Sequence, residues 1–206
     1  METYILDTNL FFNMEASLDL GARTEDVVRN LTEIAKKLKT LKQAEFIMPP
    51  RVVEEFLSFF EDKEQAFLKD FLSQVIIKSP TYTEMTVSAT ILYQLIEDIR
   101  FRSYRGLTIA EQEIQSAALL MQHSNDLSKK DFQIKIGSVV KTFRNRYRQA
   151  TRFGFLDSVA DLDLIMLAKE QSGFLVTTDE GVTKWGRIFG VKEMPAQLFG
   201  QKMKSL

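Results

Sequence analysis

The stretch that decides the fold is residues 153–181, FGFLDSVADLDLIMLAKEQSGFLVTTDEG. An apolar helical run occupies its first half, and a short, buried-looking strand, Phe174 to Thr177, follows after a break. A helix that leads into a buried strand is typical of an α/β sheet. The stretch also carries four aspartates, three where the helix begins and one just after the strand: Asp157, Asp161, Asp163 and Asp179.

The acids at the helix start have a simple explanation. Carboxylates offset the positive end of the helix dipole, and Ser158 with Asp161 forms the pattern of a capping box. Capping is not expected to explain Asp179, because it follows a strand, at the edge where open α/β sheets bind ligands. Another short apolar strand, Thr3 to Leu6, also ends in an acid, Asp7. Each acid alone is typical of a cap or a turn, but together they predict a carboxylate cluster at one sheet edge.

Length and composition are those of an ordinary globular protein. The chain has 206 residues, 45% hydrophobic and 27% charged, with a net charge of −1. This length suits one domain, or one domain with a large insertion. The sequence shows no apolar run of membrane-spanning length and no signal peptide, so we expect a cytoplasmic protein without a membrane partner.

The side chains available for catalysis are few. The chain has no cysteine, which excludes disulfides and thiolate metal sites. Its single histidine, His123, lies in a polar segment away from the acids, where a solvated loop residue is the simpler interpretation. Ser-His-Asp catalysis and histidine-rich zinc sites are therefore excluded. Carboxylates with a hard cation remain, and oxygen ligands favour Mg²⁺ or Mn²⁺.

Further helices and strands are expected on both sides of these acids. Pro50 can open a helix that carries Glu54 and Glu55. Either glutamate suits an exposed surface, and one of them could instead point towards Asp7. Helical spacing predicts helices at 24–43, 51–60, 64–74, 181–190 and from 195 onward, and short extended segments are expected at 45–48, 75–80 and 192–194.

Residues 86–152 show helical periodicity and no strand pattern. We expect one helix through residues 87–99, a second at 109–121 and a third at 129–153, with a turn at 122–127. The last two would form a helical hairpin. The sequence therefore predicts an inserted helical subdomain at 86–152, with residues 1–85 and 153–206 forming the α/β core.

Basic residues are concentrated at the end of this insertion. The segment Lys141 to Arg152, KTFRNRYRQATR, contains no acid, and its arginines at i, i+4 and i+8 form one stripe. A solvated helix face is the simpler interpretation, whereas phosphate binding gives the stripe a purpose. The residues expected to contact RNA are Arg144, Arg146, Tyr147, Arg148 and Arg152.

The acids and their order resemble a PIN nuclease domain. The matching segments are YILDTN, PRVVEE, DSVADLDLIMLA and LVTTDEG. The resemblance implies an α/β/α fold around a central parallel sheet, with the acids chelating one or two Mg²⁺ or Mn²⁺ ions. The acids that it implies as metal ligands are Asp7, Glu55, Asp157, Asp161 and Asp179.

A narrower resemblance covers nearly the whole chain. The segments AEFIMP, IRFRSYRGLTIAE and RNRYRQATRFGFLDS resemble the small prokaryotic protein-only ribonuclease P family, the homologs of Aquifex RNase P, also known in archaea as RNA ligase partner proteins. The resemblance implies removal of the 5′ leader from precursor tRNA without an RNA subunit, leaving a 5′-phosphate on the tRNA. It also implies that the inserted helices protrude, help to hold tRNA and mediate assembly of dimers into higher homo-oligomers.

Within this resemblance, the residues take different roles. Asp7, Asp157, Asp161 and Asp179 are the expected catalytic acids, and the register of the motif favours Glu55 over Glu54. Asp163 lies about 200° around the helix from Asp161, at roughly 100° per residue, and ranks below them. The residues expected to surround the ligands rather than to bind the metal directly are Thr8, Asn9, Asp163 and Thr178.

Three other functions stay open. A PIN nuclease with another RNA substrate, such as a toxin-type ribonuclease, is disfavoured by the long basic hairpin. A non-catalytic RNA-binding partner of an RNA ligase would gain nothing from clustered negative charge. A haloacid-dehalogenase-type phosphatase is the most distant alternative, because LDTN lacks a second aspartate two residues after Asp7.

Overall fold

The structure is a computed structural model that describes residues 1–12, 18–122, 128–156 and 158–205. The chain divides into two compact units. The first combines Met1–Val87 with Leu156–Leu206, and the second is Ser88–Phe155.

The first unit is built on a parallel sheet. Within the described residues its five strands are β1 (Glu2–Leu6), β2 (Ala44–Met48), β3 (Ile76–Ile77), β4 (Phe174–Val176) and β5 (Lys192–Glu193). They lie in the order β3-β2-β1-β4-β5, and every paired strand is parallel to its neighbour. The strands β2 and β3 are added in sequence on one side of the central strand β1, and β4 and β5 are added later on its other side. The strand order therefore reverses between β1 and β4, which makes their carboxyl ends a topological switch point.

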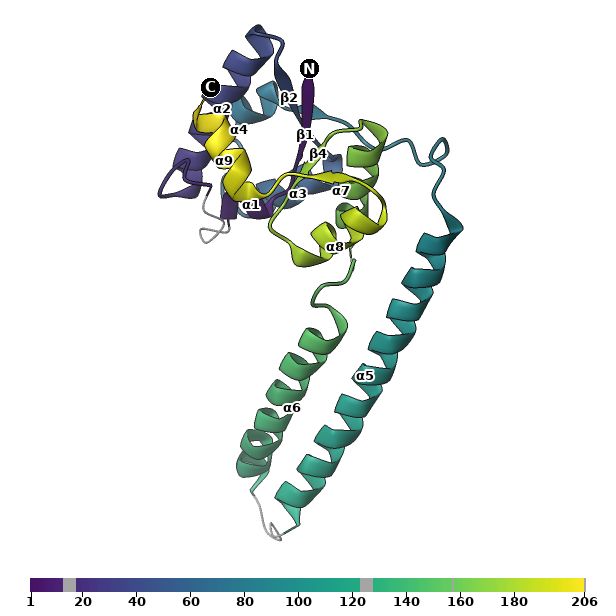
Figure 1. The fold of residues 1–206 in the computed structure, drawn as a ribbon. Coiled ribbons are helices and arrows are strands. Elements are labelled where there is room, and N and C mark those ends of the chain that lie inside the picture. Colours follow the sequence, from purple (N-terminus) through teal and green to yellow (C-terminus); the bar gives the residue numbers. More distant parts are fainter. Residues whose placement is uncertain (13–17, 123–127, 157, 206) are drawn as a thin grey trace. The chain divides into compact units, whose positions relative to one another are not determined.

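Helices cover both faces of this sheet (Figure 1). One face carries α2 (Thr24–Thr40), α4 (Ala66–Gln74) and α9 (Ala196–Lys204), and the other carries α7 (Val159–Glu170) and α8 (Glu180–Ile188). Right-handed crossovers in opposite directions from the central strand place their helices on opposite faces. The predicted α/β/α architecture with a central parallel sheet is therefore confirmed.

Aromatic residues fill much of the core. Tyr4 of β1 and Phe46 of β2 are adjacent in register, and both rings contact Phe199 of α9, with centroids 5.3 and 5.8 Å away. Trp185 of α8 is 1% exposed and belongs to the same core. Burying each large aromatic ring is worth about 1.5–3 kcal/mol, so these rings fix the helices to the sheet.

Two helix starts illustrate how local sequence sets the elements near the sheet edge. The helix α3 (Pro50–Ser58) begins directly after β2, with Pro49 as its N-cap and Pro50 in its first turn, as the sequence predicts. A proline fits there because the missing N–H would have no helical partner. A shorter helix, α1 (Asn9–Phe12), follows β1. Both helices begin at the carboxyl edge of the sheet.

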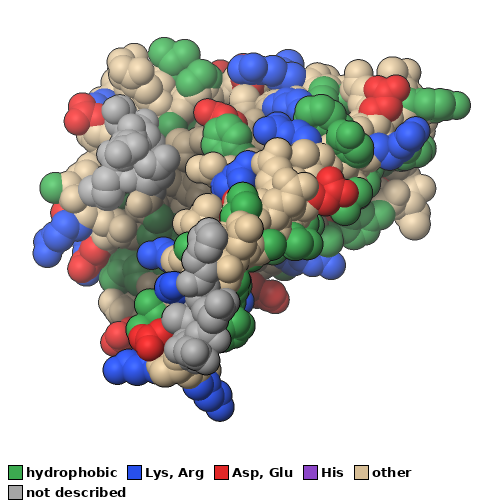
Figure 2. All heavy atoms as spheres, turned by 90° about the horizontal axis from the view of Figure 1, so that it is seen from below, with side chains coloured by type: hydrophobic (Ala, Val, Ile, Leu, Met, Phe, Trp, Pro, Cys, Tyr) green, Lys and Arg blue, Asp and Glu red, His purple; other side chains and the backbone are tan. Residues whose placement is uncertain are grey.

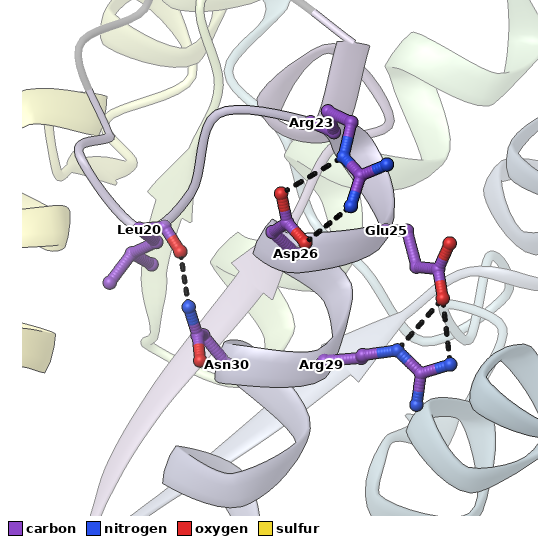
Figure 3. Close-up of polar contacts among 6 residues, drawn as sticks. All are labelled: Leu20, Arg23, Glu25, Asp26, Arg29 and Asn30. Carbon is purple, nitrogen blue, oxygen red and sulfur yellow. Dashed lines mark hydrogen bonds and ion pairs between the residues drawn. The ribbon is translucent and has the colours of Figure 1, made fainter.

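Side-chain contacts secure the start of α2 (Figure 3). Asp26 accepts hydrogen bonds from the Arg23 guanidinium, and Glu25 pairs with Arg29 one turn later at 2.7 Å. The Asn30 amide donates to the Leu20 carbonyl of the preceding segment. Acids in the first turn also suit the helix dipole. These contacts hold the segment that enters α2 against the helix.

The second unit consists of the long helix α5 (Ala89–Met121) and α6 (Lys129–Thr151), which lie side by side (Figure 1). The prediction of two separate helices at 87–99 and 109–121 is wrong, because α5 is one continuous helix of 33 residues. Gly106 lies inside it and is buried. A Cβ atom there would lie 2.8 Å from the Tyr147 ring of α6, so glycine allows the two helices to approach closely.

We expect alanine to have opposite effects at two glycines of this hairpin. Gly137 of α6 has open space around it, so Gly137→Ala should stabilise the unit by about 1 kcal/mol through helix propensity. Gly106→Ala should lose this gain or destabilise the unit, since overpacking costs about 1–3 kcal/mol. Hydrogen exchange of the α5 and α6 amides in the full chain measures both effects. Equal stabilisation by the two substitutions would contradict close packing at Gly106.

Candidate functional site

Asp7 lies at the switch point of the sheet. It follows β1 directly, its N–H donates to the Val176 carbonyl of β4 at 3.1 Å, and the residue is only 3% exposed. Hydroxyl and amide groups hold its carboxylate. Thr177 Oγ1 and Asn9 Nδ2 donate to Oδ2, the latter at 3.3 Å, and Thr8 Oγ1 donates to Oδ1 at 3.3 Å. These contacts fix the orientation of a buried carboxylate.

Asp179 is connected to Asp7 through Thr177. The Thr177 hydroxyl that donates to Asp7 also accepts from the Asp179 N–H at 2.9 Å. The expectation that capping does not explain Asp179 is wrong: Asp179 is the N-cap of α8, and its Oδ1 accepts from the Val182 N–H at 2.9 Å. The helix begins at Glu180, so the strand end is also a helix start. Only one carboxylate oxygen is used by the cap, and Oδ2 accepts no hydrogen bond from the described residues.

Glu55 of α3 is close enough to Asp7 for their charges to interact. Desolvation raises the pKa of its carboxyl, the Asp7 charge raises it further, and a hydrogen bond from Thr8 opposes both effects. Glu54 and Glu55 are both exposed, so only the influence of Asp7 and Thr8 on Glu55 distinguishes them. The interaction of Glu55 with both Asp7 and Thr8 supports the motif register that favours Glu55.

Charge repulsion and burial act on these acids. Desolvation raises the pKa of Asp7 above its ordinary value, against hydrogen bonds from Thr177 and Asn9, and the Asp179 charge raises it further. Within the described residues, neither Asp7 nor Glu55 nor Asp179 forms an ion pair with a lysine or arginine. An acidic cluster with oxygen donors and no counter-charge fits a hard divalent cation.

Asp161 lies on α7. Ser158 is its N-cap and accepts from the Asp161 N–H at 3.0 Å, which confirms the predicted cap, and the Asp161 side chain is half-buried in the first turn. Asp157 lies outside the described residues. Among the residues that are described, no three His, Cys, Asp or Glu side chains lie close enough together to hold a metal ion. The donor chemistry therefore fits a cation, although the described acids do not by themselves form a complete ligand set.

Comparison with known proteins agrees with this arrangement. Residues 3–206 match the family described as PINc domain ribonuclease. A protein of Pyrococcus horikoshii named RNA-free ribonuclease P is 31% identical over all 206 residues of this chain and 93% of its own length. Another of that name, from Alkalilimnicola ehrlichii, is 34% identical over the whole chain and 98% of its own length. The chain belongs to the RNA-free ribonuclease P family of PIN-domain ribonucleases.

In this member of the RNA-free ribonuclease P family, Asp163 of α7 has different surroundings. Asp163 is buried, and its two oxygens contact different partners. Arg51 Nη1 donates to Oδ2 at 2.7 Å, and Tyr82 Oη donates to Oδ1 at 2.6 Å. Asp163 was expected near the metal ligands, but it forms an ion pair that Asp7 does not have.

The structure also reveals site residues that sequence reasoning missed. Thr8 and Asn9, which were predicted to surround the ligands, contact Asp7, but so does Thr177, which was assigned only to the strand. The sequence does indicate such a role for Thr177, because a polar residue between a buried strand and an acid can form hydrogen bonds at the end of the strand. No comparable signal exists for Arg51 and Tyr82, because they meet Asp163 only in the folded chain.

The predicted RNA-contacting residues lie on α6 and just after it. Arg144, Arg148 and Arg152 are exposed, and Arg144 and Arg148 form no ion pair within the described residues. Arg146 differs, because its guanidinium contacts the Glu113 carboxylate and the Gln112 side chain of α5. Tyr147 packs against Gly106 and remains 42% exposed. The helix thus has both outward-facing arginines and residues that join it to α5.

Hydrophobic side chains are also exposed on α5. Their spacing places several on one face of the helix, although the packing within the hairpin does not cover them. Figure 2 shows hydrophobic side chains mixed with lysines and arginines across the visible surface. In the described part of the chain, no helix is long and apolar enough to cross a membrane. The exposed hydrophobic residues of this face are Leu92, Ile96, Ile99, Leu107 and Ile114.

The raised pKa of Asp7 predicts a characteristic pH dependence in metal-free protein. The pKa of a carboxyl in the unfolded chain is about 4. When the pKa in the folded protein is higher, ionisation of the carboxyl destabilises the fold at neutral pH, and this cost disappears as the pH falls through the folded value. In excess chelator, Asp7→Asn should therefore be more stable than wild type at pH 7, and the difference should shrink on acidification. Thermal unfolding between about pH 7 and pH 4, roughly the range in which a carboxyl with a raised pKa titrates, measures this difference.

A control for this measurement is Glu54→Gln, which removes an exposed acid from the same edge. Its unfolding temperature should stay parallel to that of the wild-type protein at every pH. A stability difference for Asp7→Asn that grows on acidification would show that the Asp7 carboxylate is stabilised in the fold, contrary to this prediction.

Proposed function

We propose that this chain is an RNA-free ribonuclease P, an endoribonuclease that removes the 5′ leader of precursor tRNA and leaves a 5′-phosphate on the tRNA. The observation that carries the proposal is the position of Asp7, Glu55 and Asp179 at the switch point of a PIN fold, where none of the three forms an ion pair with another described residue. Similarity to relatives named RNA-free ribonuclease P over the whole chain gives the cluster its substrate class.

The residues proposed to hold the metal are acids at one edge of the sheet. A bound Mg²⁺ or Mn²⁺ supplies a water of lowered pKa and offsets the negative charge that develops on the scissile phosphate. Hard oxygen ligands suit both ions. The proposed ligands are Asp7, Asp157, Asp161 and Asp179, with Glu55 joining directly or through water.

The surrounding groups prepare these acids for that role. Thr177 and Asn9 donate to one oxygen of Asp7, and Thr8 donates to the other, so the carboxylate cannot rotate freely. The α8 cap occupies one oxygen of Asp179 and leaves the second for a ligand. Without a cation the cluster would repel an RNA phosphate, so metal and substrate binding should support each other. Asp163 and Thr178 are proposed to support the ligands from nearby.

The helical unit is proposed to bind the substrate. We interpret residues 86–152 as an insertion into a nuclease core formed by 1–85 and 153–206. The exposed arginines Arg144, Arg148 and Arg152 offer a one-sign stripe for the phosphate backbone of precursor tRNA. Arg146 and Tyr147 are proposed as additional RNA contacts, because both keep exposed surface although they also join the hairpin.

The proposed assembly is a homo-oligomer in which dimers associate further. Its support is the exposed hydrophobic face of α5, because a surface of this kind typically marks a protein interface. We place the protein in the cytoplasm, where precursor tRNA is processed, and propose no membrane partner.

Incubation of purified protein with a 5′-leader-bearing precursor tRNA and Mg²⁺ tests the function. Wild type should release mature tRNA with a 5′-phosphate, and excess chelator should abolish cleavage. Asp7→Asn and Asp179→Asn should each lose nearly all turnover while staying folded. Thr177→Val should lose roughly 10- to 100-fold, as expected when a group that orients a metal ligand is removed.

Mapping of both product ends identifies the cleavage site, and circular dichroism checks the folding of each variant. Glu54→Gln is the matched control and should cleave at the wild-type rate. Cleavage of other RNAs but not of precursor tRNA would instead indicate a PIN ribonuclease with a different substrate. Full activity in chelator would exclude the metal-dependent mechanism.

The arginine stripe makes a separate prediction. Ala at Arg144 or at Arg148 should weaken binding of precursor tRNA without sequence selectivity. Each should also lower the slope of log affinity against log salt by about one unit. Arg146→Ala is the informative comparison, because it removes the partner of Glu113 and should reduce the stability of the hairpin. If the Arg144 and Arg148 variants change the oligomeric state but keep the wild-type salt slope, the stripe is a subunit interface.

A further inference from the structure

The ion pair of Asp163 with Arg51 is a second charged cluster at the edge of the sheet. Arg51 Nη1 lies 2.7 Å from Asp163 Oδ2 and 3.0 Å from Tyr82 Oη, and Tyr82 Oη lies 2.6 Å from Asp163 Oδ1. The three groups close a triangle. A buried carboxylate is costly unless it is paired and hydrogen-bonded, and here both oxygens are satisfied.

The topology places this triangle on the same side of the sheet as the catalytic acids. Arg51 is the second residue of α3, which begins just past the carboxyl end of β2, beside β1. Tyr82 comes from the segment after β3, and Asp163 lies in the second turn of α7, which starts at that edge before running back to β4. Glu55 lies one helical turn after Arg51 and therefore on the same face of α3.

The three side chains of the triangle differ in exposure, because one is buried and two are exposed. The Asp163 side chain is 2% exposed, whereas Arg51 is 53% exposed and Tyr82 is 52% exposed. A guanidinium carries five N–H donors on three nitrogens, and only Nη1 is used here by the described residues. Nε and Nη2 remain as donors. The contact of Nη1 with the buried Asp163 carboxylate restricts the orientation of the guanidinium and therefore the direction of these donors.

The pairing also keeps this cation from neutralising the catalytic acids. Arg51 bonds Asp163 and forms no ion pair with Asp7 or Glu55 in the described residues, so its charge is balanced by Asp163 and not by them. A planar guanidinium with spare, directed donors suits a phosphate better than a lysine does. The alternative is a purely structural bridge between α3, α7 and the segment that holds Tyr82.

We propose that Arg51, oriented by Asp163 and Tyr82, binds a backbone phosphate of the substrate RNA next to the catalytic acids. Asp163 and Tyr82 are positioning residues in this arrangement. The inference rests on the proposed ribonuclease function and adds to it a substrate contact in the nuclease unit itself, separate from the arginine stripe of α6.

The test removes the charge pair without leaving a buried charge unpaired. The double variant Arg51→Gln/Asp163→Asn keeps hydrogen-bonding side chains of similar shape. Its unfolding temperature, its binding of precursor tRNA in chelator at several salt concentrations, and its KM and kcat with Mg²⁺ are compared with wild type. We expect a folded protein whose KM rises about tenfold with kcat little changed, and whose log–log salt slope falls by about one unit.

The matched control is Arg187→Gln/Glu193→Gln. This pair has the same chemistry, with Arg187 Nη2 2.7 Å from Glu193 Oε1, but it lies at the end of α8 and in β5, at the opposite edge of the sheet. It should keep the wild-type salt slope and KM. If the Arg51 variant behaves like this control, the triangle is structural and the proposal is wrong. A fall in kcat at unchanged affinity would also overturn it.

A second variant keeps the proposal testable if the double variant does not fold. Arg51→Lys preserves the charge opposite Asp163, but its single ammonium has no second nitrogen directed outward. It should fold and still raise KM, whereas a structural bridge would leave KM unchanged. If wild type does not cleave precursor tRNA, the proposed function fails, but the salt slopes of binding still decide whether Arg51 contacts a phosphate.

Discussion

The structure depends on a buried carboxylate at the topological switch point of the sheet, between β1 and β4. Asp7 follows the central strand, and the neighbouring strand β4 supplies both a backbone contact to its N–H and, through Thr177, a hydroxyl to its side chain. Neutral donors of this kind orient a carboxylate without cancelling its charge. Because the same hydroxyl accepts from the Asp179 N–H, the ends of the two strands are fixed relative to each other. Burying the Asp7 carboxylate costs free energy, and it occurs at the position where open parallel sheets bind ligands.

Asp7 and Asp163, both buried, show how the surroundings of a carboxylate determine its role. Asp163 has an arginine and a tyrosine on its two oxygens, so its charge is balanced within the fold. Among the described residues Asp7 has only neutral donors, and Asp179 and Glu55 add repulsion. Removing the partner of Asp163 would leave a charge unpaired, whereas Asp7 is already in that condition. The first arrangement stabilises the positions of helices, and the second fits the proposal that a cation from outside the chain binds there.

Local patterns in the sequence were sufficient for most of the fold and for part of the site. Short apolar runs located the strands, Pro50 located the start of α3, and acids after strands located Asp7 and Asp179. The capping role of Asp179 was missed because α8 begins one residue earlier than its apolar pattern indicates. Arg51 could not be found from sequence, because its partner lies 112 residues away and no local spacing encodes that contact.

The same limit applies to the charges of the hairpin. Along α6 the arginines have no acids at helical spacing, which favours a solvent-facing or phosphate-binding role for all of them. The acid for Arg146 is instead supplied by α5, where Glu113 is buried beside it. Close approach of the two helices at Gly106 makes such a cross-helix pair feasible. Arg146 is thereby set apart from Arg144 and Arg148, which form no ion pair within the described residues. Those are the positions at which released counterions would contribute free energy to RNA binding.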